Sequence, residues 1–239
     1  MKQIDDKSID MICCDLPYGT TPCQWDVIIP FDKLWEQYNR IIKDNGAILL
    51  FGQEPFSSLV RTSNLKMYRY DWYWQKERLT NVFQVGKRPG KIIETISVFY
   101  KKQPKYNPQM EKYDGPLRSN KIGDNCRFSI TQDGNSTIKP MEYHDNGTRY
   151  PLQLVKVKRD SMYDERIHPT QKPISLLEYF IKTYTDEGDL VLDNCMGSGT
   201  TAIASLNTNR NFIGFELNEE YFNKSMKRID EIKSNVKLF

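Results

Sequence analysis

Cysteine and histidine are scarce in this sequence, with 5 Cys and 2 His among 239 residues. The cysteines are odd in number and form no CxxC pair, so we expect reduced thiols of the cytoplasm and no disulfide framework. With so few thiol and imidazole ligands, no metal site is expected. Long apolar runs are also missing. There is no stretch of about 18 apolar residues, so no membrane span is expected. The N-terminal residues do not form an apolar signal region.

Positive charge is concentrated in the middle of the chain, although the net charge is only +3. From Arg61 to Lys105 there are eleven Lys or Arg and three acids, whereas residues 174–239 carry seven basic and ten acidic residues. A basic segment in a nearly neutral chain favours a polyanion, such as a nucleic acid, held by one face. A solvated, lysine-rich surface is the alternative.

Short apolar runs alternate with helical patterns, which predicts an α/β fold with a mostly parallel central sheet. The tripeptide Asp44-Asn45-Gly46 should end the first helix, and the Gly- and Pro-containing stretch 75–91 should form a mobile loop. Strands are expected at 8–14, 47–51, 68–74, 92–100, 188–193 and 211–216, and helices at 31–43, 55–64, 174–185, from Ala202, and at 218–232.

Residues 103–166 show no regular period and are too many for an ordinary loop. We expect an irregular insertion with some short strands, which divides one domain into a first half, 1–102, and a second half, 167–239. An insertion at a ligand-bearing edge commonly carries recognition. An excursion without any ligand is the alternative.

The first expected strand runs directly into Asp15-Leu16-Pro17-Tyr18. Ligands of open α/β sheets bind outside the carboxyl ends of the strands. At such a place the Asp15 carboxylate can accept a proton or a hydrogen bond, and the Tyr18 ring can stack on a planar group. Because Asp and Pro are also common turn residues, an ordinary turn is equally compatible with these four residues.

A second candidate site follows the expected strand 188–193. Gly197-x-Gly199-x-x-Ala202 lies between a strand and a helix and matches a dinucleotide-type fingerprint. Glu216 ends the next strand, where an acid can bind ribose hydroxyls. NAD and S-adenosylmethionine (AdoMet) both carry such a ribose. Asp193, just before the turn, is better tolerated by the cationic AdoMet than by a pyrophosphate.

Together, these motifs resemble the amino-group-modifying DNA methyltransferases, in the order of their β class. In that order the catalytic motif comes first, the recognition insertion second and the AdoMet motif last. Asp15 to Tyr18 is similar to the Asp-Pro-Pro-Tyr of the family, and His168 to Pro173 and Asp193 to Thr201 are similar to its two AdoMet-side motifs. The resemblance implies a Rossmann-like methyltransferase fold with 103–166 as the target-recognition insert. Leu16 departs from the pattern, which removes rigidity but keeps a backbone carbonyl.

The resemblance also implies a mechanism, in which a base is flipped out of the duplex. Its exocyclic amine would donate to Asp15 and to the Leu16 carbonyl, with Tyr18 stacked on the base and Pro17 stiffening the turn. Thr170 and Lys172 would hold the methionine carboxylate of AdoMet, and no metal would take part. The expected AdoMet-binding residues are His168, Thr170, Lys172, Asp193, Met196, Gly197, Ser198, Gly199, Thr200, Thr201, Glu216 and Asn218, and the expected DNA-binding residues are Arg78, Lys87, Arg88 and Lys91.

The leading hypothesis is a site-specific adenine-N6 methyltransferase of double-stranded DNA, because Asp and not Ser stands at position 15. The alternatives are cytosine-N4 or RNA methylation, a catalytically silent DNA-binding homologue, and a nicotinamide-dependent oxidoreductase. The resemblance implies a cytoplasmic protein encoded by a prokaryote or a phage. It leaves a homodimer and a partner restriction nuclease open.

Overall fold

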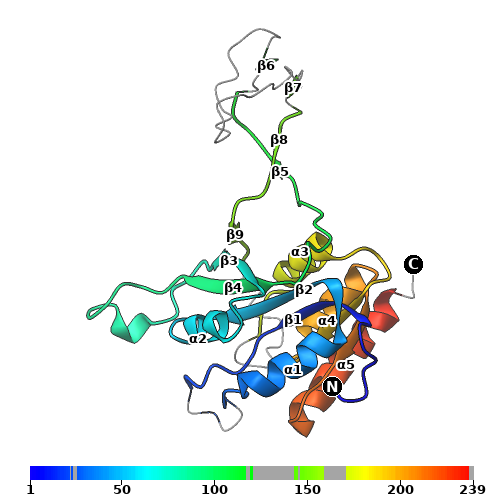
Figure 1. Cartoon of the computed structure of the whole chain (residues 1–239). Helices are drawn as coiled ribbons and strands as arrows, with labels where there is room; N and C mark the ends of the chain where they lie inside the picture. The colour runs from blue at the N-terminus through cyan, green and yellow to red at the C-terminus, as the bar shows by residue number, and fades with distance from the viewer. Residues whose placement is uncertain are drawn as a thin grey trace. The chain divides into compact units, whose positions relative to one another are not determined.

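The computed structural model (Figure 1) describes residues 1–21, 23, 26–116, 119–120, 143–144, 146–158 and 171–236. It contains two compact units, one formed by Met1–Asn107 with Leu152–Phe239 and the other by Pro108–Pro151. Within the described ranges, no helix combines the length and the apolar character that a membrane span requires.

The main unit is built on a seven-stranded sheet with the strand order β11-β10-β1-β2-β4-β3-β9. The neighbours from β11 to β2 pair in parallel, β4 runs antiparallel to both β2 and β3, and β9 is parallel to β3. The expected mostly parallel α/β sheet is therefore confirmed. Its strands are β1 (Ile9–Cys14), β2 (Ile42–Gly52), β3 (Tyr68–Gln75), β4 (Ile93–Phe99), β9 (Leu154–Lys156), β10 (Leu190–Asp193) and β11 (Asn211–Gly214).

Helices cover both faces of this sheet, because side chains of the central strands alternate between two apolar cores. Ile12 and Cys14 of β1 pack with α1 and α2, whereas Met11 and Cys13 pack with α3 on the other face. The helix α4 contributes Ala204 to the second core and packs against α5. The helices are α1 (Phe31–Ile41), α2 (Phe56–Ser63), α3 (Ile174–Tyr184), α4 (Thr200–Asn207) and α5 (Glu219–Val236).

The junction between α1 and β2 corrects one expectation. The helix ends at Ile41, and Asp44-Asn45-Gly46 lies within β2 instead of ending a helix. The pairing with β1 shifts register at this point, because residues 43–46 of β2 lie opposite Asp10 alone. A Cβ atom on Gly46 would lie 2.9 Å from the Asp10 carbonyl oxygen. Glycine is needed there for this close approach of two strands and not for helix capping.

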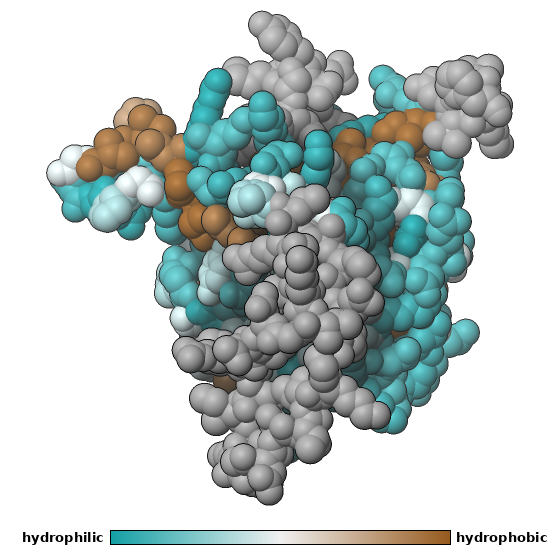
Figure 2. Space-filling model, turned by 90° about the horizontal axis from the view of Figure 1, so that it is seen from above, coloured by the Kyte–Doolittle hydropathy of each residue, from teal (hydrophilic) through white to brown (hydrophobic). Residues whose placement is uncertain are grey.

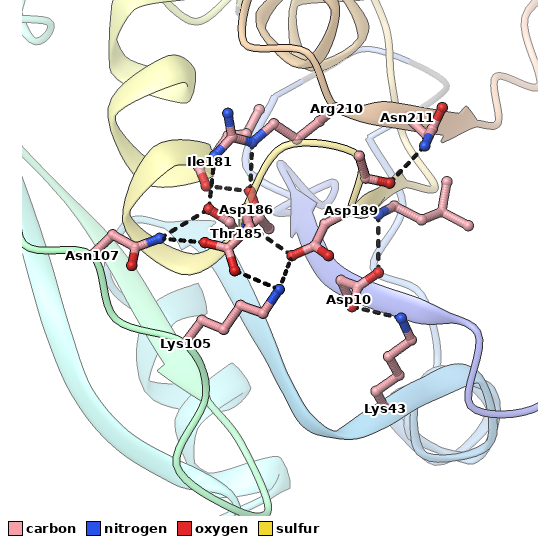
Figure 3. A network of polar contacts seen from close by, with 12 residues as sticks. Asp10, Lys43, Lys105, Asn107, Ile181, Thr185, Asp186, Asp189, Arg210 and Asn211 are labelled. Atoms are coloured by element: carbon pink, nitrogen blue, oxygen red, sulfur yellow. Dashed lines mark hydrogen bonds and ion pairs between the residues drawn. The ribbon is translucent and has the colours of Figure 1, made fainter.

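A polar network ties the segment after β4 to the loop after α3 (Figure 3). The Lys105 ammonium lies 2.8 Å from carboxylate oxygens of both Asp186 and Asp189. The Asn107 side-chain amide donates to the Thr185 carbonyl at 3.1 Å. These contacts hold the main unit together directly before its chain leaves at Pro108.

The second unit contains two short antiparallel ladders, so the expected short strands of the insertion are present. One ladder pairs β5 (Glu111–Lys112) with β8 (Thr148–Arg149). The other pairs β6 (Ser119–Asn120) with β7 (Tyr143–His144). Within the unit, the Arg149 guanidinium lies 4.0 Å from the centre of the Tyr113 ring, a cation–π contact.

Candidate active site

The two predicted motifs meet at one edge of the sheet. The strands β1 and β10 are parallel neighbours, so Asp15, which follows β1, and Asp193, which ends β10, lie at the same carboxyl edge. The chain order reverses between these two strands, which is where open α/β sheets bind ligands. A cavity of about 1020 Å³ opens at this point and is lined by both motifs.

A largely buried cluster of charged groups lines the cavity around Asp15. The Lys172 ammonium makes ion pairs with the Asp15 carboxylate and, at 2.9 Å, with Glu94. The other Glu94 oxygen is paired with Lys76. The Tyr18 hydroxyl donates to Asp15 at 2.6 Å and lies 3.3 Å from Glu94. Two carboxylates and two ammonium groups therefore balance each other within one hydrogen-bonded cluster.

The surroundings of these groups set their protonation. Burial by itself raises the pKa of Glu94, but Lys172 and Lys76 outweigh it and bring that pKa down to about 2. Burial lowers the pKa of Lys172, and Asp15 and Glu94 outweigh it, so the pKa is raised above its ordinary value. Burial and the two neighbouring carboxylates raise the pKa of the Tyr18 hydroxyl. The tyrosine is thus a neutral hydrogen-bond donor, while the lysine and the glutamate carry charge.

The rest of the first motif is fixed by apolar packing. The Leu16 side chain is buried in the same core as α1 and α2. The Tyr18 ring stacks on Phe56, with 4.9 Å between ring centres and an angle of 27° between the planes. Burial of Leu16 immobilises the turn at the position where the family pattern has a proline. Phe56, the first residue of α2, holds the tyrosine from a distant part of the chain.

The glycine turn adopts backbone geometry that favours glycine. Gly197 and Gly199 have φ angles of 50° and 71°. Asp193 accepts hydrogen bonds from the Cys195 N–H at 3.0 Å and from the Thr201 hydroxyl at 2.6 Å. Burial raises the pKa of Asp193 to about 6 despite these bonds. This carboxylate is thus engaged in holding the turn beneath the cavity.

Glu216 joins the glycine turn to the end of β11. Its two carboxylate oxygens accept the backbone N–H groups of Gly197 at 2.9 Å and of Asn218 at 2.8 Å. The Asn218 side-chain oxygen in turn accepts the Tyr221 N–H at 3.0 Å, at the beginning of α5. Leu217, next to Glu216, is fully exposed and lines the cavity. An acid and an apolar side chain therefore stand side by side at this wall.

Most of the predicted residues meet in the cavity. Of the predicted AdoMet-binding residues that are described, only Gly199 does not line it, and His168 and Thr170 lie outside the described residues. The Lys172 ammonium was expected on a methionine carboxylate, and its partners here are Asp15 and Glu94. The lining members of the predicted set are Asp15, Leu16, Pro17, Tyr18, Lys172, Asp193, Met196, Gly197, Ser198, Thr200, Thr201, Glu216 and Asn218.

The predicted DNA-binding residues do not line the cavity and lie on the loop between β3 and β4. Arg78, Lys87 and Arg88 are exposed, and Lys91 is half-buried. Sequence reasoning missed Glu94 and Lys76, which complete the charged cluster. A signal was present for Glu94, because it is an acid inside the apolar strand β4.

The chain matches a known family over most of its length. Residues 9–227 match the model of the N6/N4 group described as DNA methylase. The Type II methyltransferase M2.MboI of Moraxella bovis is 46% identical over 269 residues, which cover 99% of this chain and 86% of that protein. The DNA adenine methyltransferase YhdJ of Escherichia coli (strain K12) is 27% identical over 245 residues, covering 96% and 79%.

Solved structures agree with this match at the level of the fold. The complex of M1.HpyAVI with SAM has a TM-score of 0.59 and 24% identity, covering 92% of this chain and 89% of that one. The cytosine-N4-specific PvuII DNA methyltransferase has a TM-score of 0.62 and 18% identity, covering 95% and 81%. The expected Rossmann-like methyltransferase fold is confirmed. With the family match spanning both motifs and the segment between them, this protein belongs to the N6/N4 DNA methylase family.

Proposed function

We propose that this protein transfers a methyl group from AdoMet to the exocyclic N6 of an adenine flipped out of double-stranded DNA. The observation that carries the proposal is the position of Asp15 beside the glycine turn in one cavity. A hydrogen-bond acceptor for an amine and a binding site for the methyl donor are thereby within one cavity. Holding the two reactants together in a fixed orientation is the main source of rate that such a site can supply.

The residues of the cavity fit AdoMet. Glu216 offers carboxylate oxygens that keep acceptor capacity for ribose hydroxyls besides the two N–H groups they already accept. Leu217 offers an exposed apolar side chain for the purine ring next to that acid. Gly197 and Ser198 line the cavity and would hold the methionine part. Bound AdoMet supplies an electrophilic methyl group on a sulfonium sulfur.

On the substrate side, Asp15 accepts one hydrogen bond from the adenine amine, and the Leu16 carbonyl accepts the other. The Tyr18 hydroxyl and the Lys172 ammonium hold the Asp15 carboxylate in one orientation. We therefore assign Lys172 the positioning of Asp15, in place of the methionine carboxylate. The Tyr18 ring, backed by Phe56 on one side, offers a flat surface against which the base can stack.

Adenine is favoured over cytosine by the acid at position 15, and by the relative YhdJ, whose name gives adenine as its substrate. The likeness to the cytosine-N4-specific PvuII enzyme is at 18% identity and extends to the fold alone. Cytosine N4 is the second candidate.

The cellular setting follows from the same relatives and is part of the proposal. M2.MboI carries the name Type II methyltransferase, which supports a role in restriction–modification. The proposed location is the cytoplasm of a prokaryote, with the gene on a prokaryotic or a phage genome. A cognate restriction nuclease, a homodimer and target recognition by residues 103–166 stay predictions within it.

The test is transfer of labelled methyl groups from AdoMet to mixed-sequence duplex DNA, followed by nucleoside analysis. N6-methyladenine is expected as the product. Asp15→Ala should abolish transfer while AdoMet affinity, measured by calorimetry, stays unchanged. Asp32→Ala, which removes an exposed acid of α1, is the matched control and should keep full activity.

Other outcomes would reject parts of the proposal. N4-methylcytosine would overturn the choice of base. AdoMet binding without any methylated DNA would overturn the enzymatic function in favour of a silent DNA-binding homologue, or of RNA if RNA becomes labelled. Thermal stabilisation by NAD and not by AdoMet would overturn the cofactor.

A further inference from the structure

The loop between β3 and β4 presents apolar side chains to solvent. Phe83 is 103% exposed, on the 3-10 helix η1 (Val82–Gln84). Val82, Val85 and Leu79 around it are also exposed, by 59%, 49% and 37%. Figure 2 shows hydrophobic residues, in brown, gathered on this projecting loop at the left of the molecule. Exposed apolar side chains that gather in this way mark a candidate binding surface.

Hydrogen bonds between its two sides give the loop a defined structure. The Asn81 side chain accepts the Lys91 N–H at 2.6 Å and donates to the Pro89 carbonyl at 3.0 Å, which ties the two sides of the loop together. The Thr80 N–H donates to the Lys91 carbonyl at 3.0 Å. These bonds join residues 80–81 to residues 89–91 at the base of the loop, so that Phe83 at its tip projects into solvent.

Cations surround the apolar tip. Arg78, Lys87, Arg88 and Lys91 all lie on this loop, and among the described residues none of them is paired with a carboxylate. Glu77, an acid of the same loop, lies 3.8 Å from Lys158. A second copy of the chain, bound through the same patch, would bring these cations together and be repelled. An apolar wedge ringed by cations instead matches DNA, in which phosphates flank a stack of apolar base faces.

The loop also begins at the active site. Thr80 lines the cavity, and the Lys91 ammonium donates to Gln53, another lining residue, at 3.1 Å. Phe83 is three residues beyond Thr80, so its Cα lies within about 10 Å of the cavity wall. A base flipped into the cavity leaves its gap in the duplex outside the cavity, so a side chain on this loop can reach that gap.

We propose that Phe83, supported by Val82 and Val85, inserts into the base stack next to the target adenine and occupies the gap that the flipped base leaves. The cations of the loop would hold the phosphates on either side. This inference rests on the proposed function. Filling the gap lowers the free energy of the extruded state, because an unstacked duplex recovers stacking from the aromatic ring.

The experiment compares two synthetic duplexes that contain the methylation site mapped on the wild-type products. One has thymine opposite the target adenine, and the other has an abasic site there, which removes the pairing that must be broken. Phe83→Ala should lower kcat/KM on the paired duplex by about tenfold or more and on the abasic duplex by about twofold or less. Phe83→Trp should restore activity on the paired duplex. Leu65→Ala, which removes another exposed apolar side chain, is the matched control.

The inference is wrong if Phe83→Ala acts equally on both duplexes, because that pattern indicates a structural effect and no role in base extrusion. It is also wrong if activity on the paired duplex is unchanged, or if the variant alters only the oligomeric state. Wild-type activity on the paired duplex is measured in the same series. If the wild type transfers no methyl group, the proposed function fails, and this result is distinct from any effect of the Phe83 variants.

Discussion

The Glu94→Gln substitution tests whether the buried charged cluster is a main source of stability at the active site. The Glu94 side chain is 3% exposed and lies between the ammonium groups of Lys76 and Lys172. The amide keeps the shape and removes the charge, so two buried cations lose the carboxylate between them. Breaking a buried ion pair in this way typically costs about 3–5 kcal/mol.

The lowered pKa of Glu94 gives a second magnitude for the same contacts. The shift from its ordinary value of 4.5 to about 2 corresponds to about 3 kcal/mol of folding stability at neutral pH. Because the folded-state pKa is depressed, this stability is present above pH 4.5 and is lost as the pH falls toward 2. The difference between wild type and Glu94→Gln should therefore shrink to about half or less between pH 6 and pH 3.

Urea denaturation at a series of pH values measures both quantities. We expect Glu94→Gln to lose about 3 kcal/mol at pH 7, or ~6–12 °C in Tm for a chain of this size. Glu36→Gln, which neutralises an exposed acid of α1, should change the stability by less than about 0.5 kcal/mol. A loss below about 1 kcal/mol at pH 7, or a difference that does not depend on pH, would refute the reasoning.

Two further predictions concern the ligands. Glu216→Ala should weaken AdoMet binding by about tenfold or more, measured by calorimetry, because it removes both the ribose acceptor and the link to the Gly197 N–H; unchanged affinity would remove Glu216 from the cofactor site. The double variant Lys87→Glu with Arg88→Glu should weaken duplex binding and flatten its dependence on salt in fluorescence anisotropy, while Lys33→Glu on α1, also exposed, should not. If duplex affinity depends equally on salt concentration in the wild type and the double variant, the DNA does not contact Lys87 and Arg88.

Local patterns were sufficient for much of this protein. The period of apolar residues predicted the strands around Asp15 and Asp193, because a buried strand needs an unbroken apolar run and a following turn residue. The spacing of Gly197 and Gly199 predicted the turn, since both positions require a φ that favours glycine. Asp44-Asn45-Gly46 was predicted wrongly because it has the local composition of a helix end. The close approach of β1 that explains Gly46 is not a local property.

Contacts between distant segments determined the rest. Glu94 is 79 residues from Asp15 in the chain, and Lys172 is 157 residues from it, and they meet because β1, β4 and the residues before α3 are brought together by the sheet. The period of apolar residues does not predict which charged residues become buried partners, because pairing depends on the strand order and the depth of each side chain. The residue types thus identified the chemistry of each motif, and the folded sheet assigned Lys172 to Asp15 and set the protonation of the cluster.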